Sequence, residues 1–372
     1  MRTVYYAIVF FQTLAVTLFV TPCLIRLAKR WQIVDHPGDR KIHHAPKPLM
    51  GGVGIVIGLL LTVGGDIVIL YVFSSSHWFQ DHFSNVVDLF PLLRSVLPKL
   101  VLILAGGFLI HLLGLVDDIL KGRLSYRFKF IVQFAVISSV VLGGVRISFM
   151  PTQLLDIVVT VVWIMGITNG FNLLDNMDGL ASGISFICGG LLFVVAVLQG
   201  QVFFAFILAA LTGSCLGFLF YNFHPSKLFM GDSGSLFLGY LFGTLTATGS
   251  YVVEESVSTI PVIMPILILS IPLYDTFSVV FIRWKEKRPL FIGDKKHFSH
   301  RLVDLGMTYR GAVVYIYLVC FCVGIIALLL PYVSVGANII ILIQAITIYV
   351  LITILIATGK QKKNHVEGKS IH

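Results

Sequence analysis

The sequence predicts an all-α, polytopic integral membrane protein. Of its 372 residues, 57% are hydrophobic and only 12% are charged, and the mean hydropathy is +0.94. Apolar runs of about 20 residues, the length that crosses a bilayer, recur along the whole chain. A soluble domain needs more surface charge than this. We therefore expect one integral membrane domain over residues 1–372, with a motif-bearing core at about 35–302 and a basic tail at 359–372.

Hydropathy places eleven candidate spans along the chain. The first is longer than the apolar part of a signal peptide and ends in a basic patch at Arg26, so we expect it to be retained. The ninth contains Pro261, Pro265 and Pro272 and should therefore be kinked. In order, the spans are expected at about 4–25, 49–73, 97–116, 128–145, 153–169, 180–199, 202–221, 235–253, 259–283, 311–331 and 337–358.

The distribution of basic residues predicts the orientation. When the loops are counted alternately, one set carries 23 of the 27 Lys and Arg residues. Because cytoplasmic loops are enriched in Lys and Arg, this set is expected inside, with the N-terminus outside and the C-terminus in the cytoplasm. The net charge of +9 lies in these short loops, which indicates orientation and anionic head groups or substrates rather than nucleic acid. The same alternation assigns five acidic residues to the cytoplasmic side: Asp117, Asp118, Asp175, Asp178 and Asp232.

The first acidic motif is GLVDDILKG, in which Asp117 and Asp118 end the third span. Carboxylates at the edge of lipid are expensive and mark functional sites. Adjacent residues are about 100° apart on a helix, so one carboxylate can bind a metal or act as a base while the other orients it. Taken alone, the pair is equally well interpreted as solvated charge balanced by Lys121 and Arg123.

Two further motifs contain the remaining acids. Asn172, Asp175 and Asp178 recur every third residue in NGFNLLDNMDGLASG, so we expect them to form one stripe along a helix. A carboxamide and two carboxylates suit a divalent cation together with a phosphate or sugar. In FMGDSGSLFLG, Asp232 lies between glycines where a helix begins, and the free backbone N–H groups there favour phosphate. Both segments can also be interpreted as helix caps.

Two loops combine histidines with basic residues. The first cytoplasmic loop contains Arg40, Lys41 and His43, which could meet a lipid phosphate at the membrane surface. The last contains DKKHFSHR, in which His297, His300 and Arg301 suit a diphosphate group. Orienting charge is the alternative interpretation of both loops. Within the ninth span, Asp275 is expected to be functional or to pair with a neighbouring helix, whereas Asp66 of the second span has no evident partner.

Taken together, these motifs resemble those of the polyprenyl-phosphate N-acetylhexosamine-1-phosphate transferases, the glycosyltransferase 4 family. The resemblance extends from Asp35 to Leu302, and within the family it is strongest to the WecA/TagO-like branch, which starts teichoic-acid or O-antigen assembly. The MurNAc-pentapeptide transferase branch typically has three consecutive histidines where this chain has Lys295-Lys296-His297. The matching segments, in family order, are RKIHHAPKPLMGG, VDD, NxxNLLDNMDGLA, GDSGSLFLG, PLYDT and DxxHxxHR.

The resemblance implies transfer of GlcNAc-1-phosphate from UDP-GlcNAc to undecaprenyl phosphate, with release of UMP and dependence on Mg²⁺ or Mn²⁺. It implies Asp175 and Asp232 as metal ligands, and Asp117, supported by Asp118, as the catalytic base or acceptor-orienting group. The expected partners are these substrates and membrane lipid but no nucleic acid, with a homodimer left open. The expected substrate-binding residues are Asn172, Asp178, Lys121, Lys129, His297, His300, Arg301, Arg40, Lys41 and His43.

Two alternatives to this function stay open at this stage. One is the phospho-MurNAc-pentapeptide transferase reaction of the same family. The other is an ion-coupled transporter, because intramembrane carboxylates also mark proton paths. Transporter sites lie near the bilayer midplane between internal repeats, whereas the acids here are expected at one membrane face and no repeat of the motifs is visible.

Overall fold

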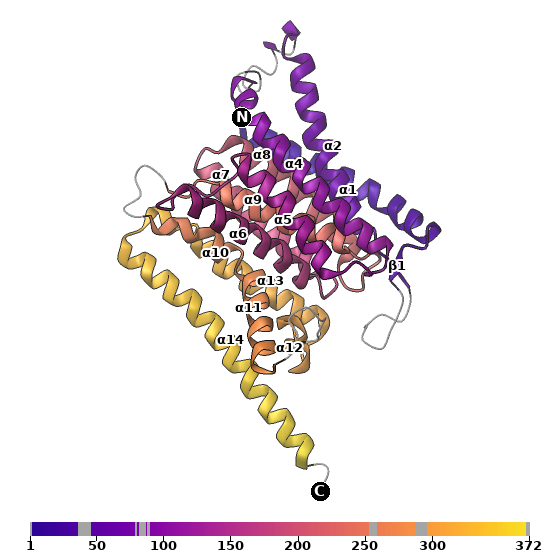
Figure 1. The fold of residues 1–372 in the computed structure, drawn as a ribbon, viewed down its shortest axis with the longest axis vertical. Coiled ribbons are helices and arrows are strands. Elements are labelled where there is room, and N and C mark those ends of the chain that lie inside the picture. Colours follow the sequence, from indigo (N-terminus) through magenta and orange to yellow (C-terminus); the bar gives the residue numbers. More distant parts are fainter. Residues whose placement is uncertain are drawn as a thin grey trace. The chain divides into compact units, whose positions relative to one another are not determined.

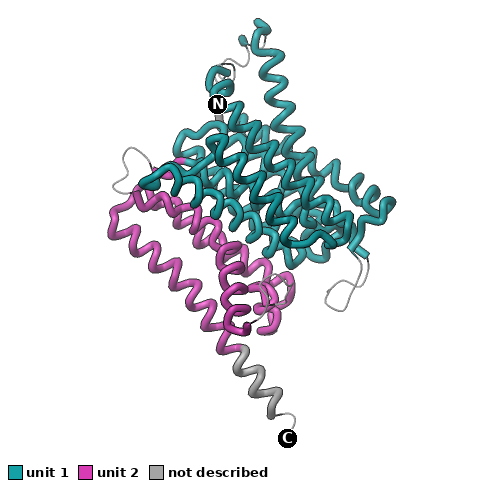
Figure 2. The backbone as a smooth tube through the Cα atoms, in the orientation of Figure 1, with its two compact units in different colours: residues 1–249 teal, residues 250–372 magenta. Residues whose placement is uncertain are grey.

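The computed structural model describes residues 2–35, 46–78, 80–81, 87, 90–252, 259–287 and 296–369. Nearly all regular structure in these ranges is α-helical, and a short antiparallel pair joins β1 (Val34–Asp35) to β2 (Lys47–Pro48). The chain is an all-α, multi-pass membrane protein, as its composition predicted. It divides into two compact units, unit 1 at Met1–Gly249 and unit 2 at Ser250–His372 (Figure 2).

Unit 1 is arranged around helix α9. All residues of α9 except Asp232 and Thr248, its first and last, are buried, and α2, α4, α6 and α7 pack against it. Figure 1 shows α9 among its neighbours. The helices of unit 1 are α1 (Arg2–Arg30), α2 (Gly51–Phe73), α4 (Phe90–Ile119), α5 (Tyr126–Leu142), α6 (Gln153–Leu174), α7 (Leu180–Leu198), α8 (Val202–Asn222) and α9 (Asp232–Thr248).

Glycines allow other backbones to approach the beginning of α9. A Cβ atom added to Gly52 of α2 would lie 2.1 Å from the backbone nitrogen of Gly234. A Cβ atom added to Gly114 of α4 would lie 2.4 Å from the carbonyl carbon of Asp232. Small residues at helix contacts are common in membranes because they let helices pack closely. The first turn of α9 is therefore enclosed by α2 and α4.

The segment before α2 pairs with the segment before α9. The Phe229 N–H donates to the Pro48 carbonyl at 2.9 Å, and the Gly51 N–H donates to the Phe229 carbonyl at 3.0 Å. One residue further on, the Gly52 N–H donates to Met230 at 2.9 Å. Two of the sequence motifs, far apart in the chain, thus lie side by side.

Eight helices in the described ranges are long and apolar enough to cross a membrane, or nine if one bent pair is counted as a single span. The bent pair joins Ile260–Ile268 to Ser270–Lys285 at an angle of 74°. This break confirms the kink predicted from the prolines, because Pro272 has no N–H to donate to the helical turn before it. The two further predicted spans correspond to α5 and α9, which have 17 residues each.

Some predicted boundaries differ from the structure. Helix α4 begins at Phe90 rather than near residue 97, with Pro98 inside the helix. Pro91 lies in the first turn of α4, where the helix loses no hydrogen bond through the missing N–H group. Helix α14 continues to Lys369, through most of the segment predicted as a basic tail.

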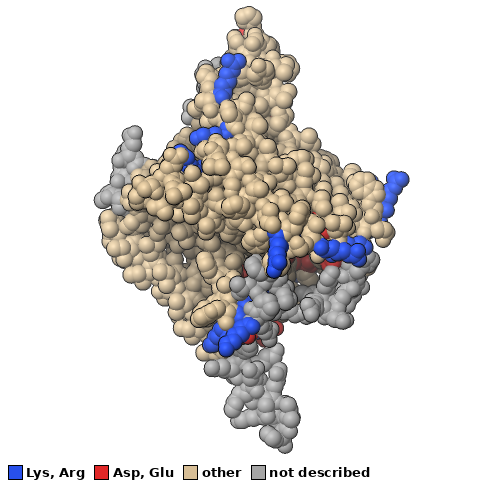
Figure 3. Space-filling view, viewed as in Figure 1, with Lys and Arg blue, Asp and Glu red and all other residues tan. Residues whose placement is uncertain are grey.

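Unit 2 contains the broken ninth span and two long helices. Most of the face of the protein drawn in Figure 3 is neither acidic nor basic, as expected of spans that face lipid. The elements of unit 2 are η1 (Ile260–Ile263), α10 (Met264–Ile268), α11 (Ser270–Lys285), α12 (Phe298–Asp304), α13 (Tyr309–Ala327), η2 (Leu330–Tyr332) and α14 (Val335–Lys369).

The contact between α2 and α9 predicts the effect of a single methyl group. Gly52→Ala would place Cβ against the backbone of Gly234, so one helix must shift, at a cost of about 1–3 kcal/mol. We expect a lower unfolding temperature in detergent. Gly64→Ala is the matched control on the same helix, since nothing lies within 4 Å of its added Cβ. Equal unfolding temperatures for the two variants would contradict the described packing.

Candidate active site

A lysine lies between two carboxylates where three helices end or begin. Lys129, in the first turn of α5, places its Nζ 2.8 Å from Oδ2 of Asp117 and 2.9 Å from Oδ2 of Asp232. Asp117 is buried near the end of α4, and its other oxygen accepts the Leu124 N–H at 3.0 Å. The structure therefore brings together one predicted catalytic residue, one predicted metal ligand and one predicted substrate-binding residue.

Asp118 has different partners from its neighbour Asp117. Its Oδ1 accepts the Asp232 N–H at 2.9 Å, and its Oδ2 accepts the Ser233 N–H at 3.0 Å. The N-cap residue of α9 is Gly231, which has no side chain to cap the helix. Asp118 thus supplies from α4 the acceptors that a helix N-terminus requires. Its role is to position Asp232.

Gly231 leaves the room that this cap needs. It has φ of 72°, a conformation that favours glycine. A Cβ atom added there would lie 2.4 Å from Oδ2 of Asp118. Gly231, the glycine before Asp232 in the GDSGS motif, is therefore required both for its backbone conformation and for the space beside Asp118.

Asn172 connects the last turn of α6 to the same acids. Its Nδ2 donates to Oδ1 of Asp232 and to Oγ of Ser235, both at 2.9 Å. Both oxygens of the Asp232 carboxylate are thus hydrogen-bonded, one to this amide and one to Lys129. The carboxylate is held in one orientation at the start of α9.

Asp175 follows at the C-terminal end of α6, and its carboxylate accepts no hydrogen bond from the residues that the structure describes. Removal from water, followed by the negative charges of Asp232, Asp118 and Asp178, raises the pKa of Asp175 to about 8. The carboxylates thus repel one another, and Asp175 holds its proton more tightly than an exposed aspartate does. A divalent cation would relieve this repulsion.

The predicted single stripe of Asn172, Asp175 and Asp178 is wrong. Helix α6 ends at Leu174, and the chain turns before Gly179, which has φ of 81°. Asp178 consequently faces another group: its Oδ2 lies 3.0 Å from Ser226 N, 3.0 Å from Nδ1 of His224 and 3.5 Å from Nζ of Lys47.

These contacts stabilise the charged form of Asp178. Partial burial alone would raise its pKa, but the Ser226 N–H and the Lys47 charge outweigh it, and the pKa of Asp178 is lowered. Asp178 is therefore an ionised carboxylate with partners of its own, unlike Asp175.

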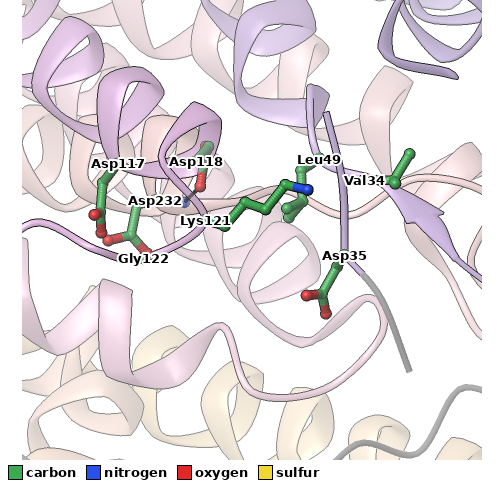
Figure 4. A pocket seen from close by; sticks show the side chains of 8 residues that line it. All are labelled: Val34, Asp35, Leu49, Asp117, Asp118, Lys121, Gly122 and Asp232. Carbon is green, nitrogen blue, oxygen red and sulfur yellow. Dashed lines mark hydrogen bonds between the residues drawn. The ribbon is translucent and has the colours of Figure 1, made fainter. Parts of the chain in front are cut away.

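Helix α4 ends in a turn that directs Lys121 away from the acids. Lys121 and Gly122 both have positive φ, 57° and 72°, which is unusual for a residue with a side chain. The Gly122 N–H donates to the Asp117 carbonyl at 2.9 Å and stabilises this turn. In Figure 4 the Lys121 side chain extends toward Leu49.

A cavity of about 430 Å³ opens beside this group. One wall carries the acids, and another carries the apolar side chains of Val34 and Leu49 (Figure 4). Such a mixed lining suits a ligand with a charged head and an apolar part. The lining residues are Val34, Asp35, Leu49, Asp117, Asp118, Lys121, Gly122 and Asp232.

Two of the predicted histidines, His297 and His300, belong to a separate group of side chains in unit 2. Nδ1 of His297 lies 2.8 Å from Oδ2 of Asp275, and the Phe298 N–H donates to Oδ1 of the same carboxylate at 2.6 Å. Asp275 therefore pairs with the beginning of α12, as one of its two interpretations expected. The ring centroids of His297 and His300 are 6.5 Å apart.

Arg301 belongs to the same group. Its Nη2 donates to Oγ of Ser278 at 2.6 Å, and its guanidinium lies 6.0 Å from the ring centroid of Tyr274. The remaining predicted substrate-binding residues, Arg40, Lys41 and His43, lie outside the described residues.

The acidic group fits a magnesium ion that is shared with substrate. No three His, Cys, Asp or Glu side chains in the described ranges form a closed metal cage. Mg²⁺ does not need one, because it typically keeps several waters and binds one or two carboxylates together with substrate phosphates. Asp175 and Asp232 supply such carboxylates, and Asn172 lies beside Asp232.

Sequence reasoning missed two polar residues that organise the site. Nδ1 of buried His111, in α4, lies 2.9 Å from the Ser233 carbonyl. Oδ1 of Asn222, at the end of α8, accepts the Gly179 N–H at 3.1 Å, while its Nδ2 donates to Leu228 at 3.0 Å. Both stand in apolar spans, where a polar side chain is itself a signal of a functional or structural contact.

Comparison with known proteins places the chain in a family. A sequence profile described as "Glycosyl transferase family 4" matches residues 100–250, which contain all five acids. The chain is 35% identical over 338 residues to the probable undecaprenyl-phosphate N-acetylglucosaminyl 1-phosphate transferase of Bacillus subtilis (strain 168), covering 88% of this chain and 86% of that protein. The chain belongs to glycosyl transferase family 4.

Two other relatives bear on the branches of the family. The decaprenyl-phosphate N-acetylglucosaminephosphotransferase of Mycolicibacterium smegmatis is 31% identical over 350 residues, 84% of this chain and 78% of that protein. A phospho-N-acetylmuramoyl-pentapeptide-transferase of Desulforamulus reducens is 49% identical over 84 residues, 23% of this chain and 25% of that protein. The long matches confirm the resemblance to the WecA/TagO-like branch.

The cap on α9 predicts the effect of an isosteric change in this family 4 chain. Asp118→Asn replaces one acceptor oxygen with an NH₂ group that faces a backbone N–H, so we expect a loss of about 1–3 kcal/mol of stability. Thermal unfolding in detergent measures it. The matched control is Asp304→Asn, at an exposed carboxylate, for which we expect a change within about 0.5 kcal/mol. Similar unfolding of both variants would argue against the cap.

Proposed function

We propose that the protein transfers GlcNAc-1-phosphate from UDP-GlcNAc to undecaprenyl phosphate, giving undecaprenyl-diphospho-GlcNAc and UMP. This would be the first membrane step in assembly of teichoic acid or another cell-envelope polysaccharide. The observation that carries the proposal is the group of Asp117, Asp232 and Lys129, beside a cavity at the helix ends. The names of the long-matching relatives support the lipid acceptor and the sugar.

The reaction joins two anions. An oxygen of the lipid phosphate attacks the β-phosphorus of the donor, a new P–O bond forms, and the bond from that phosphorus to the bridging oxygen breaks as UMP leaves. Positioning and charge neutralisation supply most of the catalysis in phosphoryl transfer. When bound, Mg²⁺ or Mn²⁺ offsets the repulsion and stabilises the leaving phosphate.

Each residue of the group has a role in this scheme. Asp175 and Asp232 would hold the metal, since the Asp175 carboxylate accepts no hydrogen bond from the described residues and Asp232 is fixed at the start of α9. Asp117 would orient the acceptor or take its proton, and Asp118 would act indirectly by fixing the start of α9. We assign Asn172, Asp178, Lys121 and Lys129 to the nucleotide sugar, and Arg40, Lys41 and His43 to the lipid phosphate. His297, His300 and Arg301 of unit 2 are assigned to the diphosphate or sugar.

The membrane arrangement is part of the proposal. At 1.5 Å per residue, a 17-residue helix is about 26 Å long, close to the thickness of the hydrocarbon core. Counting α5 and α9 as spans gives eleven, with the N-terminus outside and the C-terminus inside. The acids then lie at the cytoplasmic face of the cell membrane, where UDP-sugars occur. We include all 372 residues in one transferase domain that functions alone or as a homodimer.

The donor sugar is tested by release of UMP. Purified protein with undecaprenyl phosphate and Mg²⁺ should release UMP from UDP-GlcNAc at least about tenfold faster than from UDP-MurNAc-pentapeptide, a difference of about 1.4 kcal/mol. The Lys-Lys-His sequence in place of three histidines favours this choice, and so do the long matches, whereas the match to a pentapeptide transferase covers only 23% of this chain. The reverse preference would support the pentapeptide branch. No UMP from either donor would refute the transferase and revive the ion-coupled transporter.

The metal assignment is tested at its two carboxylates. Asp175→Asn and Asp232→Asn keep the side-chain shape but remove the charge that a hard cation requires. We expect turnover to fall about 100-fold or more in each, with weaker Mn²⁺ binding measured by electron paramagnetic resonance. Asp66→Asn is the control, since this residue contacts Gln12 in another part of unit 1. Normal Mn²⁺ binding in both site variants would exclude these ligands.

The orientation is tested by labelling cysteines in intact cells. In a variant without native cysteines, Ser75→Cys should react with a membrane-impermeant maleimide, whereas Lys285→Cys should react only after the membrane is opened. The basis is the excess of basic residues in one set of loops. Labelling with the opposite sidedness would reverse the proposed topology.

A further inference from the structure

A second polar contact joins α5 and α6 deeper in the bundle than the acidic group. Nδ2 of Asn169, in α6, donates to Oε1 of Gln133, in α5, at 2.8 Å. Gln133 is four residues beyond Lys129, and Asn169 is three residues before Asn172. Residues at these spacings share a helix face. The pair therefore lies one turn from the two residues that bind Asp232.

Gln133 is the polar residue on the buried face of α5. It is 1% exposed, and the other buried residues of this helix are Ile137, Val140 and Val141. The opposite face is apolar and exposed, with Ile131 at 66% and Phe134 at 55%. A buried amide costs free energy unless it is hydrogen-bonded. Rotating or sliding α5 would separate the two amides, whereas the apolar contacts would re-form in several registers.

The position of α5 determines which residues Nζ of Lys129 can contact. The lysine stem is flexible, yet its ammonium must contact Asp117 and Asp232 simultaneously, at 2.8 and 2.9 Å. These acids belong to α4 and α9, and α9 is fixed by burial along its length. Helix α5 has four buried residues among its 17, against 11 of 30 in α4 and 15 of 17 in α9. The segment before α5 is held by the Leu124 N–H bond to Asp117, and a polar pair one turn away adds a constraint on the rotation of α5 itself.

We propose that Gln133 and Asn169 form a positioning pair that sets the register of α5 against α6 and thereby holds Lys129 between Asp117 and Asp232. Neither amide is assigned a contact with substrate. The pair acts through Lys129, and its effect on turnover rests on the proposed function.

The first test does not depend on activity. Lys129 is modified with an amine-acylating reagent, and the rate is read by peptide mass spectrometry. Gln133→Leu and the milder Gln133→Asn, which is one methylene too short to reach, should each raise the acylation rate of Lys129 about fivefold, the effect of losing one buried hydrogen bond. The exchange Gln133→Asn with Asn169→Gln keeps both amides and their combined length. It should restore the rate to about the wild-type value.

A matched control variant lies on the same helix, α5. Ser139→Ala removes a side-chain hydrogen bond within α5, to the Ala135 carbonyl, and should leave Lys129 acylation unchanged. Wild-type acylation in Gln133→Asn would overturn the proposal, and so would failure of the exchange to restore the rate in a protein with wild-type thermal unfolding.

The second test uses turnover. Because Lys129 contacts the acids at the reacting centre and is also assigned to the nucleotide sugar, kcat for UMP release should fall about tenfold in Gln133→Asn and KM for UDP-GlcNAc should rise, and the exchange should recover both. Wild-type kcat and KM in Gln133→Asn would contradict the proposed route through Lys129. Absence of UMP release from the wild-type protein would refute the proposed function, while the acylation result would still decide the positioning pair.

Discussion

The two hydrogen bonds from the first N–H groups of α9 to the Asp118 carboxylate are the contact on which unit 1 depends. They satisfy N–H groups for which Gly231 has no side-chain acceptor, and they determine where α9 begins. Because α9 is buried along its length, its neighbours pack around that starting point. Asp232, its first residue, thereby comes within reach of Lys129 and Asn172. One carboxylate thus determines both the packing of the core and the position of the site.

The same solution recurs in unit 2, where Asp275 of α11 accepts the first N–H of α12 and also contacts His297. In both units a carboxylate on one helix accepts hydrogen bonds from the first one or two N–H groups of another helix. In both units it also contacts a predicted site residue, Asp232 in unit 1 and His297 in unit 2. This explains why the acidic motifs could be interpreted either as caps or as site residues. In this protein, capping is the means by which the site is positioned.

The sequence was sufficient to predict the membrane class, most helices, the kink near Pro272 and the acids that meet in unit 1, because each depends on local composition. It was insufficient where partners are distant in the chain. The Asp118 cap joins residues 114 positions apart, and a cap from another helix leaves no local pattern. The stripe from Asn172 to Asp178 failed because spacing alone does not reveal that α6 ends at Leu174. His111 and Asn222 were visible as polar residues in apolar spans, but their partners are mostly backbone carbonyls and N–H groups, which every sequence contains.

The central position of α9 also has a consequence for biosynthesis. It is the last helix of unit 1, and the helices that pack against it (α2, α4, α6 and α7) all precede it in the chain. During synthesis, the helices that surround α9 therefore emerge from the ribosome before α9 itself. Until Asp232 and Ser233 emerge, Asp118 has neither of its two N–H donors, and the space between α2 and α4 lacks its occupant. A nascent chain that ends before Asp232 therefore keeps Asp118 without these hydrogen bonds and leaves the space between α2 and α4 unfilled.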